Sequence, residues 1–368
     1  MYPTNGQIAL FEQTLTACRH AYNWMLDNRE DEYTNRGYSL TCYDQIKRLS
    51  LFRQTWEELQ TVHSQVLQNV AVRVDLAFKA FFRRVKAGEE PGYPRFKGRD
   101  GYDSFTYPQS GFSVKENIVK LSKIGEVKIK LHRPIIGKIK TCTIRRQNDK
   151  WYVCFSCEVE EQILPATGQS IGIDVGLEKF ASTSDGTFVE NPRFFRKEEE
   201  ALAKAQRKLS KQTKGTKEWR EAKKVVARIH ERIKNRRHNF IHQLSRKLVN
   251  ENDVIVVEKL NVDNMVKNHC LSKSIHDASW TQFRYALDYK AASAGRKLIL
   301  VNPAYTSQDC SGCGFRAKKP LKERWHLCPM CGLSLDRDVN AAINILRLGL
   351  QSLVGAPHLE APGLSRGE

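Results

Sequence analysis

The sequence of 368 residues has no long hydrophobic run. Its apolar runs are short, as at residues 254–257, and none approaches the roughly 20 residues that a membrane-spanning helix needs. The first residues also carry no secretory signal. We therefore expect a cytoplasmic protein without a membrane partner, in which cysteine thiols stay reduced. The ten cysteines are then expected to be metal ligands or packed thiols, not disulfides.

The sequence also has fewer acidic residues than basic ones. Asp and Glu number 41 against 60 Lys and Arg, which gives a formal net charge of +19. A protein this basic usually binds a polyanion, most often nucleic acid, although charge alone does not distinguish it from a ribosomal-type surface. With 40% hydrophobic residues the composition is otherwise globular, and the length suits about two or three domains.

The positive charge is concentrated in residues 193–247, a predicted helical stretch. This stretch holds 19 lysines and arginines, six glutamates and no aspartate. A salt-bridged surface would need more acids, so we favour a pair of helices that faces nucleic acid. The predicted contacts are Lys208, Lys211, Lys223 and Lys224. The hydrophobic stripe expected on the buried side is Val225, Ile229, Ile233, Phe240, Leu244 and Leu248.

The N-terminal part divides by its hydrophobic periodicity. Spacings of three and four from Phe11 onward predict packed helices over residues 1–90. Residues 88–101 then form a loop in which Tyr93, Arg95 and Lys97 mix aromatic and basic side chains. Such a loop suits phosphate contact and base stacking, and an ordinary proline-fixed connector fits it equally well. Residues 105–160 are rich in short strand patterns and suggest a small β-barrel.

A second α/β pattern begins after a polar linker at residues 160–169. Consecutive strands are predicted at residues 170–176, 180–183 and 187–190, with Asp174 near the end of the first. Two more strands follow the basic helices, at residues 253–258 and 297–301, and a helix at residues 278–294 separates them. A last helix is predicted at residues 339–348. Three antiparallel strands opening a domain, with an acid ending the first, are typical of an RNase H-like nuclease.

Three acids stand where such a nuclease would need them. Asp174 and Glu258 each end a buried strand, and Asp338 opens the last helix. Acids gathered at one sheet edge can hold two divalent cations about 3.5–4 Å apart, one activating water and one stabilising the leaving oxygen. All-oxygen ligands favour Mg²⁺ or Mn²⁺. Simpler roles stay open: Asp338 as a helix cap, Glu258 as a partner of Lys259 or of an arginine, or Asp336 as the ligand in place of Asp338.

Two Cys-x-x-Cys pairs are the strongest local signal. Cys310 and Cys313 are followed by Cys328 and Cys331, with glycines that allow tight knuckle turns. This spacing predicts a closed tetrahedral Zn²⁺ site that is structural and not catalytic, with redox pairing as the alternative. The remaining cysteines are expected to be packed thiols, including Cys154 and Cys157, which lie in an alternating strand.

The order of these motifs resembles the TnpB (OrfB) family of transposon-encoded RNA-guided nucleases, which are related to type V CRISPR effectors. The resemblance runs from Tyr2 to about Leu348. It depends on short stretches that are weak singly and specific together. These are Tyr2-Pro3, Tyr22-Asn23, Gly92-Tyr93-Pro94-Arg95-Phe96-Lys97, Gly172-Ile173-Asp174-Val175-Gly176, Val257-Glu258-Lys259-Leu260, Tyr289-Lys290-Ala291, Thr306-Ser307-Gln308 and Asp336-Arg337-Asp338-Val339-Asn340-Ala341-Ala342.

The resemblance implies an α/β multidomain fold. A RuvC-like (RNase H-like) nuclease domain would occupy residues 167–302 and 334–348, with a zinc ribbon inserted at residues 303–333. A wedge β-barrel at residues 1–10 and 91–166 would be interrupted by a helical recognition domain at residues 11–90, and residues 349–368 would be a disordered tail. The family usually has a further strand before Tyr2-Pro3, so the barrel is expected to lack its N-terminal strand. By position, Asp174, Glu258 and Asp338 match the family's catalytic triad, and Gln68 matches a residue that reads the target-adjacent motif.

We therefore predict a metal-dependent, RNA-guided double-stranded DNA endonuclease of an insertion sequence, which cuts next to a short motif. The implied partners are a guide RNA from the transposon end and the DNA target, with no small-molecule substrate. Base pairing would choose the sequence, and the protein would hold the heteroduplex by its backbone and shape. Two alternatives stay open: a protein that binds RNA and DNA without cutting, and an accessory transposase that joins strands.

Overall fold

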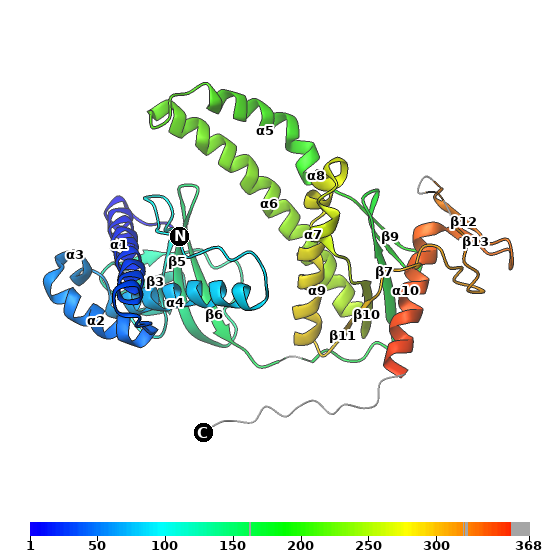
Figure 1. The fold of residues 1–368 in the computed structure, drawn as a ribbon, viewed down its shortest axis with the longest axis horizontal. Helices are drawn as coiled ribbons and strands as arrows, with labels where there is room; N and C mark the ends of the chain where they lie inside the picture. Colours follow the sequence, from blue (N-terminus) through cyan, green and yellow to red (C-terminus); the bar gives the residue numbers. More distant parts are fainter. Residues whose placement is uncertain (162, 319, 321–322, 355–368) are drawn as a thin grey trace. The chain divides into compact units, whose positions relative to one another are not determined.

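The computed structural model describes residues 1–161, 163–318, 320 and 323–354 (Figure 1). It divides into two compact units, Met1–Glu160 and Glu161–Glu368, and each is considered by itself. Within the described residues, no helix combines the length and the apolar character that crossing a membrane requires.

The first unit begins with the predicted helices. They are α1 (Asn5–Arg36), α2 (Cys42–Thr55), α3 (Glu57–Gln60) and α4 (Ser64–Lys86). The Thr4 hydroxyl accepts a hydrogen bond from the N–H of Gln7, and the Gln7 side chain accepts one from the N–H of Thr4, so a capping box starts α1. Gly37, with φ of 63°, ends this helix in the left-handed region. The predicted inward face of α1 is buried, with Phe11 and Met25 fully covered.

The strands of the first unit form two antiparallel sheets of three strands each. One sheet has the order β1 (Ser104–Tyr107), β5 (Lys138–Gln147), β6 (Lys150–Glu158). The other has the order β2 (Phe112–Lys115), β3 (Ile118–Leu121), β4 (Gly125–Lys128). Asn148 and Asp149 both have positive φ and form the tight turn between β5 and β6. These two sheets and the helices share one hydrophobic core, and a closed barrel stays a prediction.

The second unit is built around a five-stranded sheet with the order β11-β10-β7-β8-β9. As predicted, β7 (Ser170–Val175), β8 (Lys179–Thr183) and β9 (Phe188–Glu190) are consecutive and antiparallel. The central strand β10 (Val254–Glu258) runs parallel to both β7 and β11 (Lys297–Val301). The parallel pairing brings the carboxyl ends of β7 and β10 to the same edge of the sheet.

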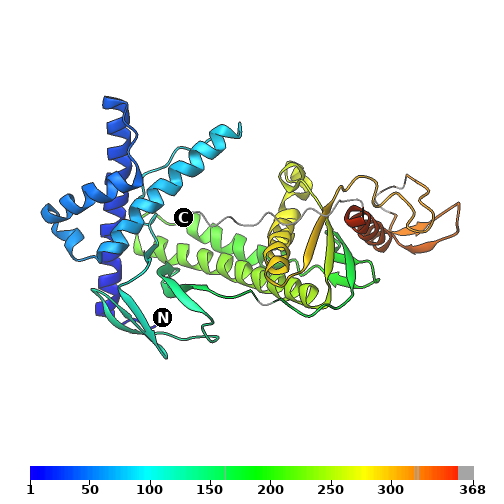
Figure 2. The same cartoon turned by 90° about the horizontal axis from the view of Figure 1, so that it is seen from below.

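Helices cover the two faces of this sheet (Figures 1 and 2). On one face, α6 (Lys217–Glu251) and α9 (Trp280–Ser293) pack on Ile171, Ile173 and Ile255. On the other face, α10 (Arg337–Val354) packs on Val256 through Ile345. The short helices α7 (Val262–Met265) and α8 (His269–Ala278), which the periodicity did not predict, connect β10 to α9.

The basic segment forms a helical hairpin, in which α5 (Phe194–Ser210) packs against the first half of α6. A small core of Leu202, Ala205, Ile229 and Ile233 joins the two helices. The expected position of Val225 in this core was wrong, because its side chain is 47% exposed and Val226 packs inward instead. The seam follows Ala222, Val226 and Ile229, a spacing that leaves the neighbouring valine facing water.

The last helix also differs from the expectation, because α10 continues through Val354 where a disordered tail was predicted from residue 349. Gly349 explains the extension, since a Cβ atom at this residue would stand 2.5 Å from Val256 Cγ1. The helix therefore still packs on β10 at this turn, and residues 350–353 continue it as an exposed extension. Residues 355–368 of the predicted tail lie outside the described residues.

At Gly172, the backbone of α10 packs directly on β7. A Cβ atom there would lie 2.2 Å from the carbonyl oxygen of Ala342 and 2.7 Å from the backbone nitrogen of Leu346. Both atoms belong to the backbone of α10, so no side-chain rotation relieves the clash. We predict that Gly172→Ala lowers the free energy of unfolding by about 1–3 kcal/mol, the usual cost of overpacking a core.

Chemical denaturation of the full chain measures this effect. Gly6→Ala in α1 is the matched control, because a Cβ atom at Gly6 has no neighbour within 4 Å and alanine favours the helix. Equal unfolding midpoints for the two variants would show that α10 moves away from β7 at no cost.

Candidate active site and metal centre

The three predicted acids come to one edge of the sheet, on the face that α10 covers. In the pairing of β10 with β7, Val256 lies opposite Gly172 and Val257 opposite Ile173, so Asp174 and Glu258 are the next residues of the two strands. Side chains alternate along a strand, and Gly172 and Val256 face α10. Asp174 and Glu258 therefore face α10 as well. Asp338 lies in the first turn of this helix.

Burial and mutual repulsion raise the pKa values of these carboxyls. Burial raises the pKa of Asp174 well above its usual range, and the charges of Glu258 and Asp338 raise it further. Burial also raises the pKa of Glu258. For Asp338, burial and the neighbouring Asp336 raise the pKa. Acids that are desolvated and close to one another favour a bound cation, and such shifts are concentrated at functional sites.

The structure assigns Asp336 and Asp338 different roles. The Oδ1 atom of Asp336 accepts a hydrogen bond of 2.8 Å from the backbone N–H of Asp338, and its Oδ2 atom lies 2.9 Å from the Lys179 ammonium. Asp336 therefore caps α10, so the alternative role of Asp338 as the cap was wrong. The Asp338 carboxylate is close enough to Asp174 to raise its pKa, and Arg324 Nη1 lies 3.9 Å from Asp338 Oδ1.

Thr306 is a site residue whose role sequence reasoning missed. Its hydroxyl donates a hydrogen bond of 2.6 Å to Glu258 Oε1, which opposes the rise in the pKa of this carboxyl. Glu258 is thus held by Thr306. The alternative pairing of Glu258 with Lys259 is not needed to hold it. The threonine lies in the segment that leads from β11 to the cysteines.

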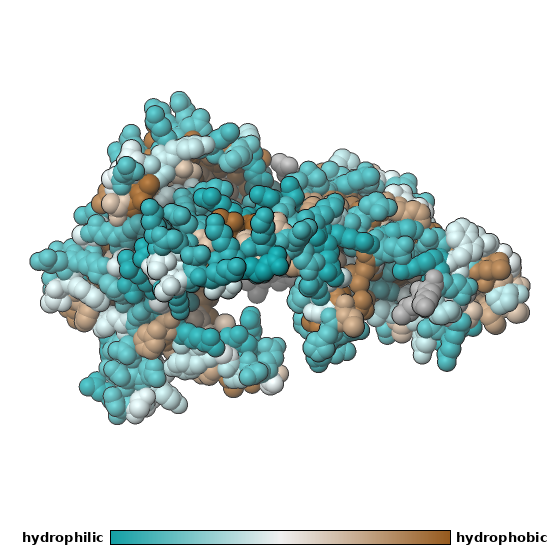
Figure 3. All heavy atoms as spheres, turned by 90° about the horizontal axis from the view of Figure 1, so that it is seen from above, coloured by the Kyte–Doolittle hydropathy of each residue, from teal (hydrophilic) through white to brown (hydrophobic). Residues whose placement is uncertain are grey.

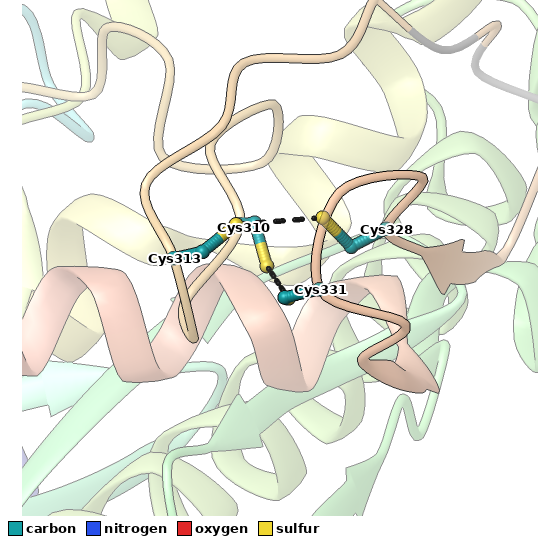
Figure 4. A group of neighbouring side chains, drawn as sticks. All are labelled: Cys310, Cys313, Cys328 and Cys331. Carbon is teal, nitrogen blue, oxygen red and sulfur yellow. Dashed lines mark hydrogen bonds between the residues drawn. The ribbon is translucent and has the colours of Figure 1, made fainter.

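The four predicted cysteines form a compact cluster (Figure 4). Their sulfur atoms all lie within 4.8 Å of one another, and Cys310–Cys331 and Cys313–Cys328 are 3.6 and 3.5 Å apart. Four thiolates around one Zn²⁺ have sulfur–sulfur distances of about 3.8 Å, so the donor set fits a tetrahedral metal site. Backbone N–H groups of Cys331 and Met330 lower the pKa of Cys328 to about 6, which favours its thiolate form.

Across the residues that the structure describes, this cluster is the one group of three or more ligand-type side chains compact enough for a single ion. The carboxylates of Asp174, Glu258 and Asp338 lie at one edge of the sheet and interact electrostatically, but their oxygen atoms do not form a group compact enough for a single ion.

Two asparagines hold the cysteine segment against α10. Asn340 accepts a hydrogen bond of 2.8 Å from the N–H of Ser311 and donates one of 2.8 Å to the carbonyl of Asp309. One turn later, Asn344 donates to the carbonyls of Thr306 and Asp309 at 2.9 and 2.6 Å. Both asparagines are buried. Their spacing of four within the otherwise apolar residues 339–346 is the sequence signal that points to a polar contact on this helix face.

The predicted nucleic-acid contacts of the first unit are accessible. Gln68, Tyr93 and Arg95 are exposed, while Lys97 is half-buried. The loop that carries them is anchored, because the Asn23 side chain bonds both the N–H and the carbonyl of Lys97. The Tyr93 ring meets Phe81 edge-on at 5.4 Å, so it has a packing role as well.

In the second unit, the four predicted lysines, Lys208, Lys211, Lys223 and Lys224, are exposed on the helical hairpin. Figure 3 shows this hairpin from its outer side, where the surface is largely hydrophilic. Lys223 also lies over the Trp219 ring at 5.0 Å, so its stem is partly held in place.

The comparisons with known proteins cover nearly the whole chain. Residues 154–269 match the family model OrfB_IS605, described as "Probable transposase". A protein of Streptomyces pristinaespiralis named "Putative RNA-guided DNA endonuclease" is 36% identical over 358 residues, which is 95% of this chain and 88% of that protein. The chain belongs to the TnpB (OrfB) family. An Escherichia coli K12 relative with the same description, InsQ, is 32% identical over 90% of this chain and 87% of its own length.

Further matches of this TnpB-family chain concern its parts and its fold. Residues 280–345 match the model "Cas12f1-like, TNB domain", which includes the four cysteines. Residues 1–38 match a model described as a helix-turn-helix domain, although Asn5–Arg36 here form one uninterrupted helix. The cryo-EM structure of the Cas12f1–sgRNA–target DNA complex superposes with a TM-score of 0.61 at 14% identity, over 92% of this chain and 82% of that one. This likeness establishes the fold.

Proposed function

We propose that this TnpB-family protein is an RNA-guided endonuclease of an insertion sequence that cleaves double-stranded DNA next to a short motif. The observation that carries the proposal is the meeting of Asp174, Glu258 and Asp338 at one sheet edge from β7, β10 and α10. The two relatives named above are described as RNA-guided DNA endonucleases and align over 88% and 87% of their lengths.

The three carboxylates would hold Mg²⁺ or Mn²⁺, because hard cations prefer oxygen ligands. Two such ions would supply an activated water and stabilise the leaving oxygen of the phosphodiester. The protein fixes the positions of the carboxylates that would bind these ions. Thr306 orients Glu258, and the cap formed by Asp336 sets the first turn of α10 and with it Asp338.

The cysteine cluster would hold Zn²⁺ in a structural role. Four thiolates fill a tetrahedral shell and leave no position for a substrate. Among the described residues, β12 (Trp325–Leu327) lies within the ribbon and β13 (Ser334–Asp336) directly follows it, and two strands this short cannot bury a core of their own. Metal binding would therefore supply its folding energy. Because β13 leads directly into α10, order in the ribbon would also position Asp338.

Guide RNA and DNA would contact both units. Gln68 would read the target-adjacent motif, and Tyr93, Arg95 and Lys97 would contact backbone or bases. The basic hairpin of α5 and α6 would face phosphates.

We also propose the division expected from the resemblance, with a wedge at residues 1–10 and 91–166, a recognition domain at residues 11–90, a nuclease domain at residues 167–302 and 334–348, and the ribbon at residues 303–333.

We predict that Asp174→Ala abolishes cleavage and leaves guided DNA binding intact, because only metal coordination is lost. Removing one member of a catalytic set costs several orders of magnitude in rate. The test incubates the purified protein with its co-expressed RNA, Mg²⁺ and a plasmid that carries the matching target. Asp31→Ala, at an exposed position of α1, is the control and should cut normally. Cleavage by the Asp174 variant at the wild-type rate would contradict the assignment, and strand joining would favour a transposase.

The zinc assignment predicts that Cys328→Ser loses bound zinc and cuts more slowly, with a smaller effect on RNA binding. Metal analysis of the purified full chain gives the zinc content. Cys154→Ser is the control, because Cys154 lies outside the cluster and its thiol is exposed. The prediction that the remaining cysteines are packed was wrong for Cys154 and Cys270, whose side chains the structure leaves exposed. The assignment fails if the wild-type protein contains no zinc, or if the Cys328 variant keeps both its zinc and its full cleavage rate.

The hairpin assignment predicts a change in salt dependence. Replacing Lys208, Lys211, Lys223 and Lys224 with glutamine should flatten the log–log dependence of DNA affinity on salt by up to about 0.9 for each phosphate that the lysines no longer neutralise. The control removes four exposed lysines of the β2-β3-β4 sheet and its turns, Lys115, Lys120, Lys123 and Lys128. Equal slopes for both sets would mean that only net charge matters and that the hairpin has no special role.

A further inference from the structure

Four rings form a row on the outer surface of α6 and α9, within the second unit. We call His238, His242, Tyr285 and Tyr289 the aromatic row. The centroids of neighbouring rings are 4.0 Å apart for His238 and His242, 6.4 Å for His242 and Tyr289, and 5.8 Å for Tyr289 and Tyr285. Both pairs have a spacing of four within their helix, so each pair occupies one helix face.

The row is not part of the hydrophobic core. The opposite face of α9 carries Trp280, Phe283 and Leu287, which are buried against the sheet. Tyr285 is 68% exposed and Tyr289 is 43% exposed. Adjacent exposed aromatic rings on a soluble protein mark an interaction surface more often than isolated ones do.

Hydrogen bonds hold the inner rings of the row in place. The Nε2 atoms of His238 and His242 are 2.9 Å apart, and the Tyr289 hydroxyl lies 3.3 Å from His242 Nδ1. Burial lowers the pKa of His242, and the charges of His238, Lys290 and Arg246 lower it further. The His242 ring is therefore mostly neutral at physiological pH. Rings that hydrogen bonds already hold lose little freedom when another flat ring stacks on them.

Positive charge surrounds the row. Arg246 follows His242 by one helical turn, is exposed, and lies close enough to act on His242, Tyr289 and Lys290. The ammonium of the buried Lys290 donates to the His242 carbonyl at 2.7 Å and to Ser245 Oγ at 2.8 Å. On α9, the exposed Asp288 is the acid between the two tyrosines. A surface of exposed rings with cations beside it suits an anion that carries flat bases.

The first turns of α9 reach the end of β10 that carries Glu258, from the sheet face opposite α10. Trp280, Thr281 and Arg284, from the first turns of α9, line a small cavity together with Glu258. Tyr285 directly follows Arg284, and Tyr289 lies one turn farther from this end of β10.

We propose that the aromatic row is a stacking surface for the unpaired bases of a single nucleic-acid strand. The row would guide such a strand toward or away from the carboxylate edge, and this part of the inference rests on the proposed function. The stacking itself depends only on the rings and on the cations beside them. Stacking on an aromatic ring requires a base but no particular sequence, so the surface should bind single strands of differing sequence.

The test compares two fluorescein-labelled single strands of equal length in EDTA, with binding to the full chain followed by anisotropy. One strand is oligo-dT, and the other has the same phosphates but abasic sugars. The double variant Tyr285→Ala with Tyr289→Ala should bind oligo-dT about tenfold or more weakly, because each stacked base contributes strongly to affinity. Its affinity for the abasic strand should not change. Tyr285→Phe with Tyr289→Phe keeps both rings and should bind like the wild type.

Two controls separate stacking from charge and from the loss of any exposed tyrosine. Asp288→Asn should strengthen binding of both strands equally, since it changes only charge. Tyr33→Ala removes a ring that is 67% exposed on α1 and should change neither affinity. The proposal is overturned if the double alanine variant binds both strands as the wild type does, or loses affinity for both equally.

A third outcome would assign the surface to protein contacts. If sedimentation shows that the wild type self-associates and that the double alanine variant is monomeric, with no base-dependent loss of affinity, the row is an interface between copies and the proposal is wrong. Guided cleavage with Mg²⁺ is measured separately. Absent cleavage with ring-dependent oligo-dT binding would remove the proposed function and leave the stacking surface standing.

Discussion

The contact of α10 with β7 at Gly172 is the constraint on which the candidate active site depends. The helix backbone comes so close to the strand that no Cβ atom fits between them. Farther along the helix, Gly349 packs directly on the Val256 side chain of β10, where a Cβ atom would also clash. These two contacts hold the helix on the sheet, and they thereby fix the position of its first turn. Asp338 then lies beside the ends of β7 and β10, although 80 residues of chain separate it from Glu258.

The cysteine ribbon is tied to the same helix and the same edge. Asn340 and Asn344 bond backbone groups of Thr306, Asp309 and Ser311, and the Thr306 hydroxyl bonds Glu258. These are buried polar contacts, and leaving any of them unpaired would cost about 1–3 kcal/mol. The segment between β11 and α10 therefore does more than connect two elements. It links one carboxylate of the site to the helix that carries another.

Much of the site could be predicted from sequence because its signals are local. An acid that ends a buried strand and a pair of Cys-x-x-Cys knuckles are visible in short windows, and the structure brings these residues together at two places. The choice between Asp336 and Asp338 needed geometry, since both acids fit a helix start and only the hydrogen bonds show which one is the cap. Asn340 and Asn344 were missed because their partners are backbone groups roughly 30 residues away. Periodicity also failed for Val225, where a packed seam between two helices decides which of two adjacent valines is buried.

Asp277 fixes the direction in which the basic hairpin of α5 and α6 leaves the sheet. This buried aspartate of α8 accepts hydrogen bonds from the N–H groups of Phe195 and Arg196, the first residues of α5, and so occupies the positive end of that helix. Arg237 of α6 lies 2.8 Å from the same carboxylate. One acid thus holds both helices of the hairpin at the point where they leave the sheet. Because α8 is packed into the core through Ile275, the direction of the hairpin is set by the core that also sets the carboxylates. Lysines far along the hairpin can then have a defined position relative to Asp174, which a flexible basic arm would not provide.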